Sequence, residues 1–145
     1  MNPGLLYSIL EVTLKSGCAV LGTDKLIIGE VDEIELEDGF FDYFEKYNLK
    51  TSKIHLPARI SKEERERIKD TALAIYKILG CSGFARVDMF YTKDKKIVFN
   101  EVNTIPGCTS HSRYPSMLKE IGIPFEEVID CFQIVFFKII KEAIF

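Results

Sequence analysis

The chain has 145 residues, of which 47% are hydrophobic and 28% charged, and its formal net charge is −3. This composition is typical of one soluble globular domain, and the mild acidity argues against a nucleic-acid-binding surface. The four cysteines are far apart without zinc-type spacing, so we interpret them as the reduced thiols of a cytoplasmic protein.

The first part of the chain predicts two strands and a long loop. SGCAVLG and KLIIGEVDEIEL are typical of strands, and a turn at residues 22–24 separates them. Residues 37–57 are aromatic and charged without clean periodicity, which predicts a loop with aromatic anchors and a strand at its end. A loop of this length inside a compact domain is usually functional.

The remaining chain predicts a helix, a hairpin and two more helices. Ser61 and Glu64 form a capping box before an amphipathic helix that ends near Gly80. GFARVDMFY and IVFNEVN follow as strands joined through TKDKK, and residues 114–121 are expected to be helical. A last helix begins at Pro124 and is apolar on more than one side, which indicates burial against a further surface. Its IVFFKII run is interrupted by Lys138 and is too short to span a membrane.

The hairpin places polar residues opposite one another. If an even number of residues closes the turn, Asp88 lies opposite Glu101 and Arg86 lies opposite Asn103. Strand alternation also places Phe99 on the face that carries Glu101. An odd loop would shift the register and separate these pairs.

Two facing carboxylates on a buried sheet repel each other and require a positive charge. Arg86 supplies one such charge, and a divalent cation would supply two. Asp88, Glu101 and Asn103 offer only oxygen ligands, which suits magnesium bound to nucleotide phosphates. The alternative is a structural ion network of Arg86, Asp88 and Glu101, with Asn103 capping a turn.

The segment TIPGCTSHSRYP, directly after the second hairpin strand, is rich in backbone donors and hydroxyl groups. The Gly107 N–H can approach a ligand closely, and Ser112 lies at the expected start of a helix, where an anion is favoured. Arg113 could hold a polar ligand, and in the aromatic loop Lys46 and Tyr47 could reach phosphate and substrate. The alternative is a polar turn with solvated side chains.

The strings GFARVDMFY and FNEVNTIPGCTSHSRYP, together with FFDYFEKY upstream, resemble the C-terminal part of the D-alanine–D-alanine ligase family, which has the ATP-grasp fold. The resemblance implies an α+β fold, an antiparallel sheet with packed helices, for residues 17–145. Residues 1–16 are expected to be a divergent N-terminal segment, because Lys15 stands where the family has a ribose-binding acid.

The resemblance also implies a reaction. ATP and two Mg²⁺ ions, or Mn²⁺ in their place, would form an acyl phosphate on D-alanine, which a second D-amino acid attacks to give a peptidoglycan precursor. The implied roles are metal binding for Asp88, Glu101 and Asn103; stabilisation of the tetrahedral intermediate for Arg86 and the Gly107 amide; substrate carboxylate binding for Ser112; contacts to ATP for Lys46 and Phe40; and a hydrogen-bond network for Tyr47.

Arg113 directly follows the TSHS serine, where ordinary members often carry an apolar residue. In this respect the chain resembles the VanG-type D-alanine–D-serine ligases of vancomycin resistance, and Phe41 and Asp32 also fit that subgroup. A guanidinium can bind the hydroxyl of D-serine, which D-alanine lacks. The resemblance therefore favours D-serine as the second substrate, with D-alanine as the alternative.

Family enzymes are much longer than this chain, so we expect a truncated ligase of weak or no activity. The expected partners are small-molecule substrates, D-alanine and D-serine, without nucleic acid or membrane; a homodimer or a companion ligase chain would supply missing parts. A non-catalytic remnant or interaction module is the alternative. Another ATP-grasp carboxylate–amine ligase is a third interpretation, against which TSHSRYP argues.

Overall fold

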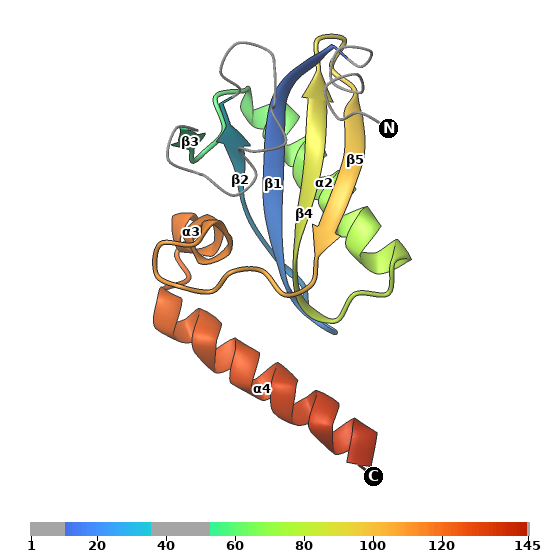
Figure 1. Ribbon diagram of the computed structural model, residues 1–145, viewed down its shortest axis with the longest axis vertical. Coiled ribbons are helices and arrows are strands. Elements are labelled where there is room, and N and C mark those ends of the chain that lie inside the picture. The colour runs from blue at the N-terminus through green and yellow to red at the C-terminus, as the bar shows by residue number, and fades with distance from the viewer. Residues whose placement is uncertain (1–10, 36–52, 145) are drawn as a thin grey trace, which may run out of the picture.

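The computed structural model describes residues 11–35 and 53–144, apart from the side chain of Ile139. Its strands are β1 (Val12–Gly22), β2 (Ile27–Ile34), β3 (Ile54–His55), β4 (Gly83–Thr92) and β5 (Ile97–Asn103). Its helices are α2 (Lys62–Ile78), α3 (Arg113–Glu120) and α4 (Phe125–Ile144). The strands form one sheet in the order β3-β2-β1-β4-β5, and every neighbouring pair is antiparallel (Figure 1). The expected α+β architecture is confirmed.

Helices cover both faces of the sheet, and strand alternation decides which residue meets which helix. On β1, Cys18 and Val20 belong to the core cluster with Ile68 and Tyr76 of α2. The intervening Ala19 and Leu21 belong to the cluster formed with α3 and the first part of α4. The sheet is therefore buried on both faces at its centre, which explains the nearly continuous apolar runs in β1 and β4.

The termini of α2 agree with the sequence. The Ser61 side chain accepts from the Glu64 N–H at 3.2 Å, and the Glu64 carboxylate accepts from the Ser61 N–H at 3.0 Å. At the other end Gly80 has φ of 65°, and the Cys81 N–H donates to the Tyr76 carbonyl at 3.0 Å. This is a Schellman motif, in which glycine adopts the left-handed conformation without steric cost.

The strand β1 begins at Val12, earlier than the strand predicted from Ser16. The pairs Lys15–Phe90 and Ser16–Met89 extend the ladder between β1 and β4 through this region. Residues 12–16, which the sequence set apart as divergent, are thus part of the sheet. Lys15 and Ser16 are buried polar residues, which is why the apolar pattern did not reveal the strand.

The hairpin β4–β5 confirms the predicted pairs but not the predicted turn. Thr92 and Lys96 close a three-residue loop, and Lys95 within it has φ of 62°. This odd loop shifts the register by one, and an irregularity between Asp88 and Met89 shifts it back. Phe99 consequently pairs with Met89, so its predicted place on the face of Glu101 is wrong.

The last helix, α4, packs on the sheet only through its first part. Val128 is fully buried, and the ring of Phe132 stacks on Phe84 with centroids 4.0 Å apart. Val135 also lies against Gly83 at the start of β4, and beyond it the helix runs past the end of the sheet (Figure 1). No helix in the described part of the chain is long and apolar enough to cross a membrane.

Candidate functional site

The predicted site residues of the hairpin lie on one face of the sheet. Asp88 pairs with Glu101, and Arg86 pairs with Asn103, across neighbouring positions of β4 and β5. Directly paired residues of antiparallel strands project to the same side. Asp88 and Glu101 therefore point to the same face of the sheet, as a shared site requires.

The Asp88 carboxylate is fully buried and is neutralised by Arg86. Its Oδ1 accepts from Arg86 Nε at 2.8 Å, and its Oδ2 accepts from Arg86 Nη2 at 2.8 Å. A second cation lies near, because Arg113 Nη2 is 3.7 Å from Asp88 Oδ1. The buried charge of Asp88 is thus compensated by a bidentate ion pair with Arg86, which is the strongest geometry for a guanidinium and a carboxylate.

Arg113 itself is held by Asp32 of β2, which is 81 residues away in sequence. Nε donates to Oδ2 at 2.6 Å and Nη2 donates to Oδ1 at 2.8 Å. Burial alone would lower the pKa of Arg113, but hydrogen bonds to Asp32 and the charges of Asp32, Asp88 and Glu101 outweigh it and raise that pKa. Arg86, Asp88, Arg113 and Asp32 therefore form a row of alternating charges across β4, α3 and β2, which we call the charge row.

Gly17 is the residue that sequence reasoning missed. It lies on β1 beneath the charge row, and its N–H donates to Asp32 Oδ1 at 2.8 Å. A Cβ atom at this position would lie 2.5 Å from Arg113 Nη2 and 2.8 Å from Asp88 Oδ1. An isolated glycine within an apolar strand often marks such a close approach, so a signal was available.

Tyr114 positions Arg113 at the first residue of α3. The Tyr114 ring is fully buried, and its hydroxyl donates to the Val20 carbonyl of β1 at 2.9 Å. Burial raises the pKa of this hydroxyl well above its ordinary value, so it remains a donor. The helix is thereby fixed on the sheet with its first residue over Gly17.

The loop between β5 and α3 brings Gly107 and Ser112 together. A Cβ atom on Gly107 would lie 3.3 Å from Ser112 Oγ. That oxygen accepts from the Thr109 N–H at 3.0 Å and is 2.9 Å from the Thr109 hydroxyl. Ser112 is the N-cap residue of α3, so the helix start lies one residue earlier than predicted.

The alternative of a purely structural network is observed in part. Arg86 and Asp88 form an ion pair, and Asn103 Oδ1 accepts from the Ile105 N–H at 3.0 Å, as in a turn cap. Glu101 does not belong to that network. Within residues 11–35 and 53–144, no hydrogen bond or ion pair within 4 Å engages its carboxylate, which is exposed.

The oxygen atoms of the candidate site are donors that a divalent cation can bind. The described residues contain no cluster of three histidine, cysteine or acidic side chains suited to a metal. The candidate ligands are instead two carboxylates and one amide, Asp88, Glu101 and Asn103, which are the hard oxygen donors that Mg²⁺ binds together with substrate phosphates and water. Each Asp88 oxygen keeps a second lone pair beside its bond from Arg86, so the donor set fits.

Four predicted site residues belong to the aromatic loop: Phe40, Phe41, Lys46 and Tyr47. They lie outside the described residues. The other eight predicted residues are brought to one region. Arg86, Asp88, Glu101 and Asn103 come from the hairpin; Asp32 comes from β2; Gly107, Ser112 and Arg113 come from the loop and the start of α3.

The family model described as the C-terminus of D-alanine–D-alanine ligase matches residues 10–134. The chain belongs to the D-alanine–D-alanine ligase family. The ATP-grasp domain expected from the sequence is confirmed by the sheet order and by this match.

Solved and curated relatives show how far the similarity extends. VanG D-Ala:D-Ser ligase from Enterococcus faecalis is 63% identical with a TM-score of 0.75, over 84% of this chain and 36% of that protein. The resistance protein VanA of Enterococcus faecium is 50% identical over 119 residues, which are 79% of this chain and 35% of VanA. D-alanine–D-alanine ligase from Bacillus anthracis, solved with ATP, is 28% identical with a TM-score of 0.68, over 90% of this chain and 41% of that protein. The chain spans about a third of the length of its first curated relatives.

Proposed function

We propose that this domain supplies the metal-binding and acyl-transfer part of an ATP-dependent ligase that joins D-alanine to a second D-amino acid for peptidoglycan synthesis. The observation that carries the proposal is the pairing of Asp88 with Glu101 beside Asn103 on one face of the sheet. Family membership and the ATP complex of the Bacillus anthracis relative support a nucleotide at this place.

In this proposal Asp88, Glu101 and Asn103 hold two magnesium ions, whose chemistry is to neutralise the phosphates of ATP. In the structure, both hydrogen bonds of the Arg86 guanidinium go to the Asp88 carboxylate, so its charge is neutralised there. A cation on Asp88 would replace that charge and leave the guanidinium available to an oxyanion. Arg86 and the Gly107 N–H would then stabilise the tetrahedral intermediate, and Ser112 would bind the carboxylate of the second substrate.

The remaining roles follow the family resemblance. Lys46 and Phe40 would contact the phosphates and adenine of ATP, and Tyr47 would join the hydrogen bonds near the substrates. The proposed division into a divergent segment, 1–16, and a ligase domain, 17–145, is one of sequence only, since β1 crosses it from Val12 and the family match begins at residue 10. Because the chain spans only about a third of its relatives, turnover is proposed for the whole enzyme and not for this domain alone.

The metal and nucleotide site is tested by thermal unfolding of the 145-residue chain with Mg²⁺ and ATP. A ligand at about tenfold its dissociation constant adds about 1.4 kcal/mol to the free energy of unfolding. Glu101→Gln should fold normally, because its carboxylate is exposed, and should lose the Mg²⁺-dependent part of the shift. Glu120→Gln on α3, an exposed acid away from the hairpin, is the matched control.

Two results would contradict this proposal. One is an unchanged melting temperature at millimolar Mg²⁺ and ATP, which would favour a non-catalytic remnant or interaction module. The other is an equal shift in wild type and Glu101→Gln, which would place the ligand elsewhere.

We further propose D-serine as the second substrate, with vancomycin resistance as the cellular role. Arg113 lies one residue after Ser112, and its Nε and Nη2 are engaged by Asp32. Nη1 makes no hydrogen bond to the described residues and could therefore donate to a hydroxyl. In a full-length ligase that contains this domain, Arg113→Leu should lower kcat/KM for D-serine relative to D-alanine by about tenfold, the effect of one lost hydrogen bond in a built site. An unchanged preference would show that Arg113 does not select the substrate.

A further inference from the structure

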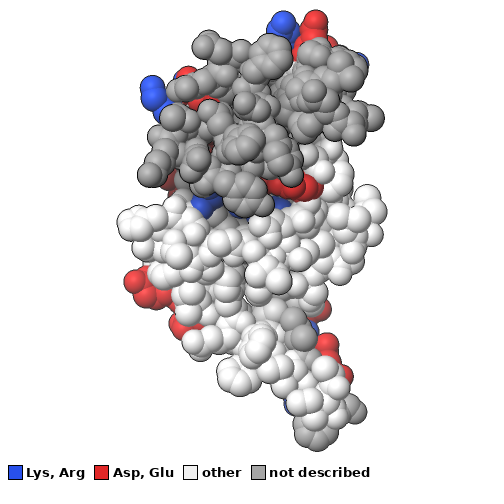
Figure 2. Space-filling model, viewed as in Figure 1, with Lys and Arg blue, Asp and Glu red and all other residues white. Residues whose placement is uncertain are grey.

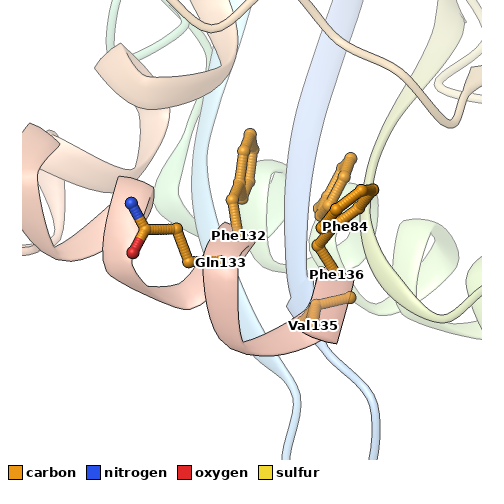
Figure 3. A pocket seen from close by; sticks show the side chains of 5 residues that line it. All are labelled: Phe84, Phe132, Gln133, Val135 and Phe136. Atoms are coloured by element: carbon orange, nitrogen blue, oxygen red, sulfur yellow. The ribbon is translucent and has the colours of Figure 1, made fainter. Parts of the chain in front are cut away.

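An apolar pocket of about 310 Å³ lies between α4 and the start of β4. Figure 3 shows Phe132, Val135 and Phe136 of α4 near Phe84 of β4, with Gln133 at the rim. Its lining carries almost no polar group that could orient a ligand, so the pocket does not identify an occupant. The charge row differs from this pocket, because each of its side chains has a defined polar partner.

The charge row lies on the backbone of β1 at one residue, Gly17. In the sheet, Gly17 pairs with Asp32 of β2 on one side and with Asp88 of β4 on the other. Directly paired residues project to the same face, so both carboxylates flank the space above Gly17. Arg113 lies between them, with Nε 2.6 Å from Asp32 Oδ2 and Nη2 3.7 Å from Asp88 Oδ1. Figure 2 shows acidic and basic atoms in the middle of the face that it presents, above a largely uncharged surface.

Gly17 is required here by space and not by backbone conformation. Its φ is not positive, unlike that of Gly22 and Gly83, so other residues could adopt its backbone conformation. A glycine inside a strand weakens the strand, because it has no side chain to pack. The space above Gly17 is filled instead by Arg113, whose Nη2 would lie only 2.5 Å from an added Cβ atom. The missing side chain therefore sets how close the guanidinium lies to the sheet.

The Gly17 backbone also orients the partner of Arg113. Its N–H donates to Asp32 Oδ1 at 2.8 Å, and the same oxygen accepts from Arg113 Nη2 at 2.8 Å. The side chains of Asp32 and Arg113 are only 1% and 11% exposed, so water does not replace a lost partner at this carboxylate. Gly17 thus fixes the guanidinium in two ways, by leaving room for it and by holding its carboxylate.

One nitrogen of Arg113, Nη1, remains for an external group, because Nε and Nη2 are engaged by Asp32. The guanidinium is planar and rigid, so the position of Nη1 follows from that of the other two nitrogens. A methyl group added at Gly17 would lift the guanidinium and move Nη1 with it. A displacement of about 1 Å is enough to break a hydrogen bond to a substrate hydroxyl.

We propose that Gly17 is a positioning residue for the second substrate: it sets the depth of the Arg113 guanidinium in the subsite of that substrate, and thereby the selectivity for D-serine over D-alanine. Gly17 acts through Arg113 and Asp32 and does not itself contact the substrate. The inference rests on the proposed role of Arg113 in binding the D-serine hydroxyl. It extends that role to β1, a strand to which the proposed function assigns no residue.

Nuclear magnetic resonance of the ¹⁵N-labelled 145-residue chain tests the position of Arg113 without substrate. The buried Arg113 Nε–H should exchange slowly with solvent in the wild type, and Gly17→Ala should speed its exchange at least about tenfold. Gly29→Ala is the matched control, because its added Cβ atom would meet Ala19 and Met117 at 3.1 Å, also beneath α3. This control should change the exchange of the Arg113 Nε–H by less than about twofold. Arg113→Lys identifies the resonance.

The Gly17 amide gives a second measurement that leaves Gly17 unchanged. Asp32→Ala removes the carboxylate that accepts from the Gly17 N–H and from Arg113. Both N–H groups should then exchange at least about tenfold faster than in the wild type. A Gly17 amide that exchanged at the wild-type rate would show that it does not hold Asp32 and would overturn the proposal, even if Gly17→Ala did not fold.

Kinetics test the consequence for the substrate. In a full-length ligase that contains this domain, Gly17→Ala should lower the ratio of kcat/KM for D-serine to kcat/KM for D-alanine by about tenfold, the effect of one lost hydrogen bond. Any disturbance of Asp88 slows both substrates and cancels in the ratio. In an Arg113→Leu background, Gly17→Ala should change this ratio by less than about twofold, because it acts through Arg113. Gly29→Ala should leave the ratio at its wild-type value.

Failure of this inference and failure of the proposed function give different results. A ratio that Gly17→Ala leaves unchanged and Arg113→Leu lowers would overturn the inference and leave the proposed role of Arg113 intact. A ratio that Arg113→Leu also leaves unchanged would refute that role, and with it the inference. Wild-type exchange of the Arg113 Nε–H in folded Gly17→Ala, or an equal increase in Gly29→Ala, would overturn the inference alone.

Discussion

Among single residues, Gly17 is where the smallest change has the largest expected effect. Gly17→Ala would place a methyl group 2.5 Å from Arg113 Nη2 and 2.8 Å from Asp88 Oδ1. Asp88 cannot move away without breaking its bidentate ion pair with Arg86, and Arg113 cannot do so without breaking its pair with Asp32. We expect the free energy of unfolding to fall by about 1–3 kcal/mol, as for other overpacked buried sites, and urea denaturation measures it.

Gly107→Ala provides the matched control for this substitution. Gly107 is exposed, and an added Cβ atom would meet only Ser112 at 3.3 Å for Oγ and 3.7 Å for Cβ. Its effect on unfolding should stay within about 0.5 kcal/mol. Equal losses for the two variants would mean that the charge row moves to accept an added methyl group without loss of its ion pairs, which would contradict this prediction.

At the same scale, the sequence predicted the hairpin residues and not their long-range partners. Alternation alone placed Arg86 and Asp88 on one face, because side-chain direction in a strand has a period of two. No local pattern could pair Arg113 with Asp32 across 81 residues. The resemblance connected both with a substrate preference, whereas the structure shows that they bind each other.

Among the elements, the hairpin shows how a correct prediction can rest on an incorrect turn. The sequence-based register assumed an even loop, but the loop has three residues, with Lys95 in the left-handed region. A second register shift, between Asp88 and Met89, restores the pairing of Asp88 with Glu101 at the candidate site. Bulges re-aim side chains next to active sites, and hydrophobic alternation does not reveal them.

The ends of the helix α2 could be predicted from the sequence, whereas the start of the strand β1 could not. The capping box at Ser61 and the glycine at position 80 are local signals with local causes, so both ends of α2 could be predicted. The beginning of β1 depends on tertiary contacts instead. Ser16 is buried, and the cost of burying its hydroxyl is offset by a bond to the Met89 carbonyl at 3.3 Å, a partner that only the folded sheet supplies.

For the whole molecule, the carboxyl groups predict how stability depends on pH. The pKa values of Glu33, Glu35, Glu63, Glu64 and Asp94 are all lowered in the folded state. The unfolded chain therefore binds more protons in the acid range, and stability rises with pH there. These contributions are complete above the ordinary carboxyl pKa and are lost as pH falls through the folded values.

Glu64 provides the clearest test of this dependence, because it joins α2 to the hairpin. Its pKa is lowered from 4.5 to about 2 by the hydrogen bond from the Tyr91 hydroxyl, the Ser61 N–H and Lys95. Glu64→Gln should melt below wild type at pH 6. The difference should shrink as pH falls from about 4.5, should be mostly lost near pH 2, where the folded carboxylate is half protonated, and should vanish only below that pH. Melting curves by circular dichroism measure this convergence, with Glu120→Gln, which removes an exposed acid outside this contact, as the control. A Glu64→Gln difference that stayed constant down to pH 2 would show that the carboxylate charge contributes nothing to the contact between α2 and β4.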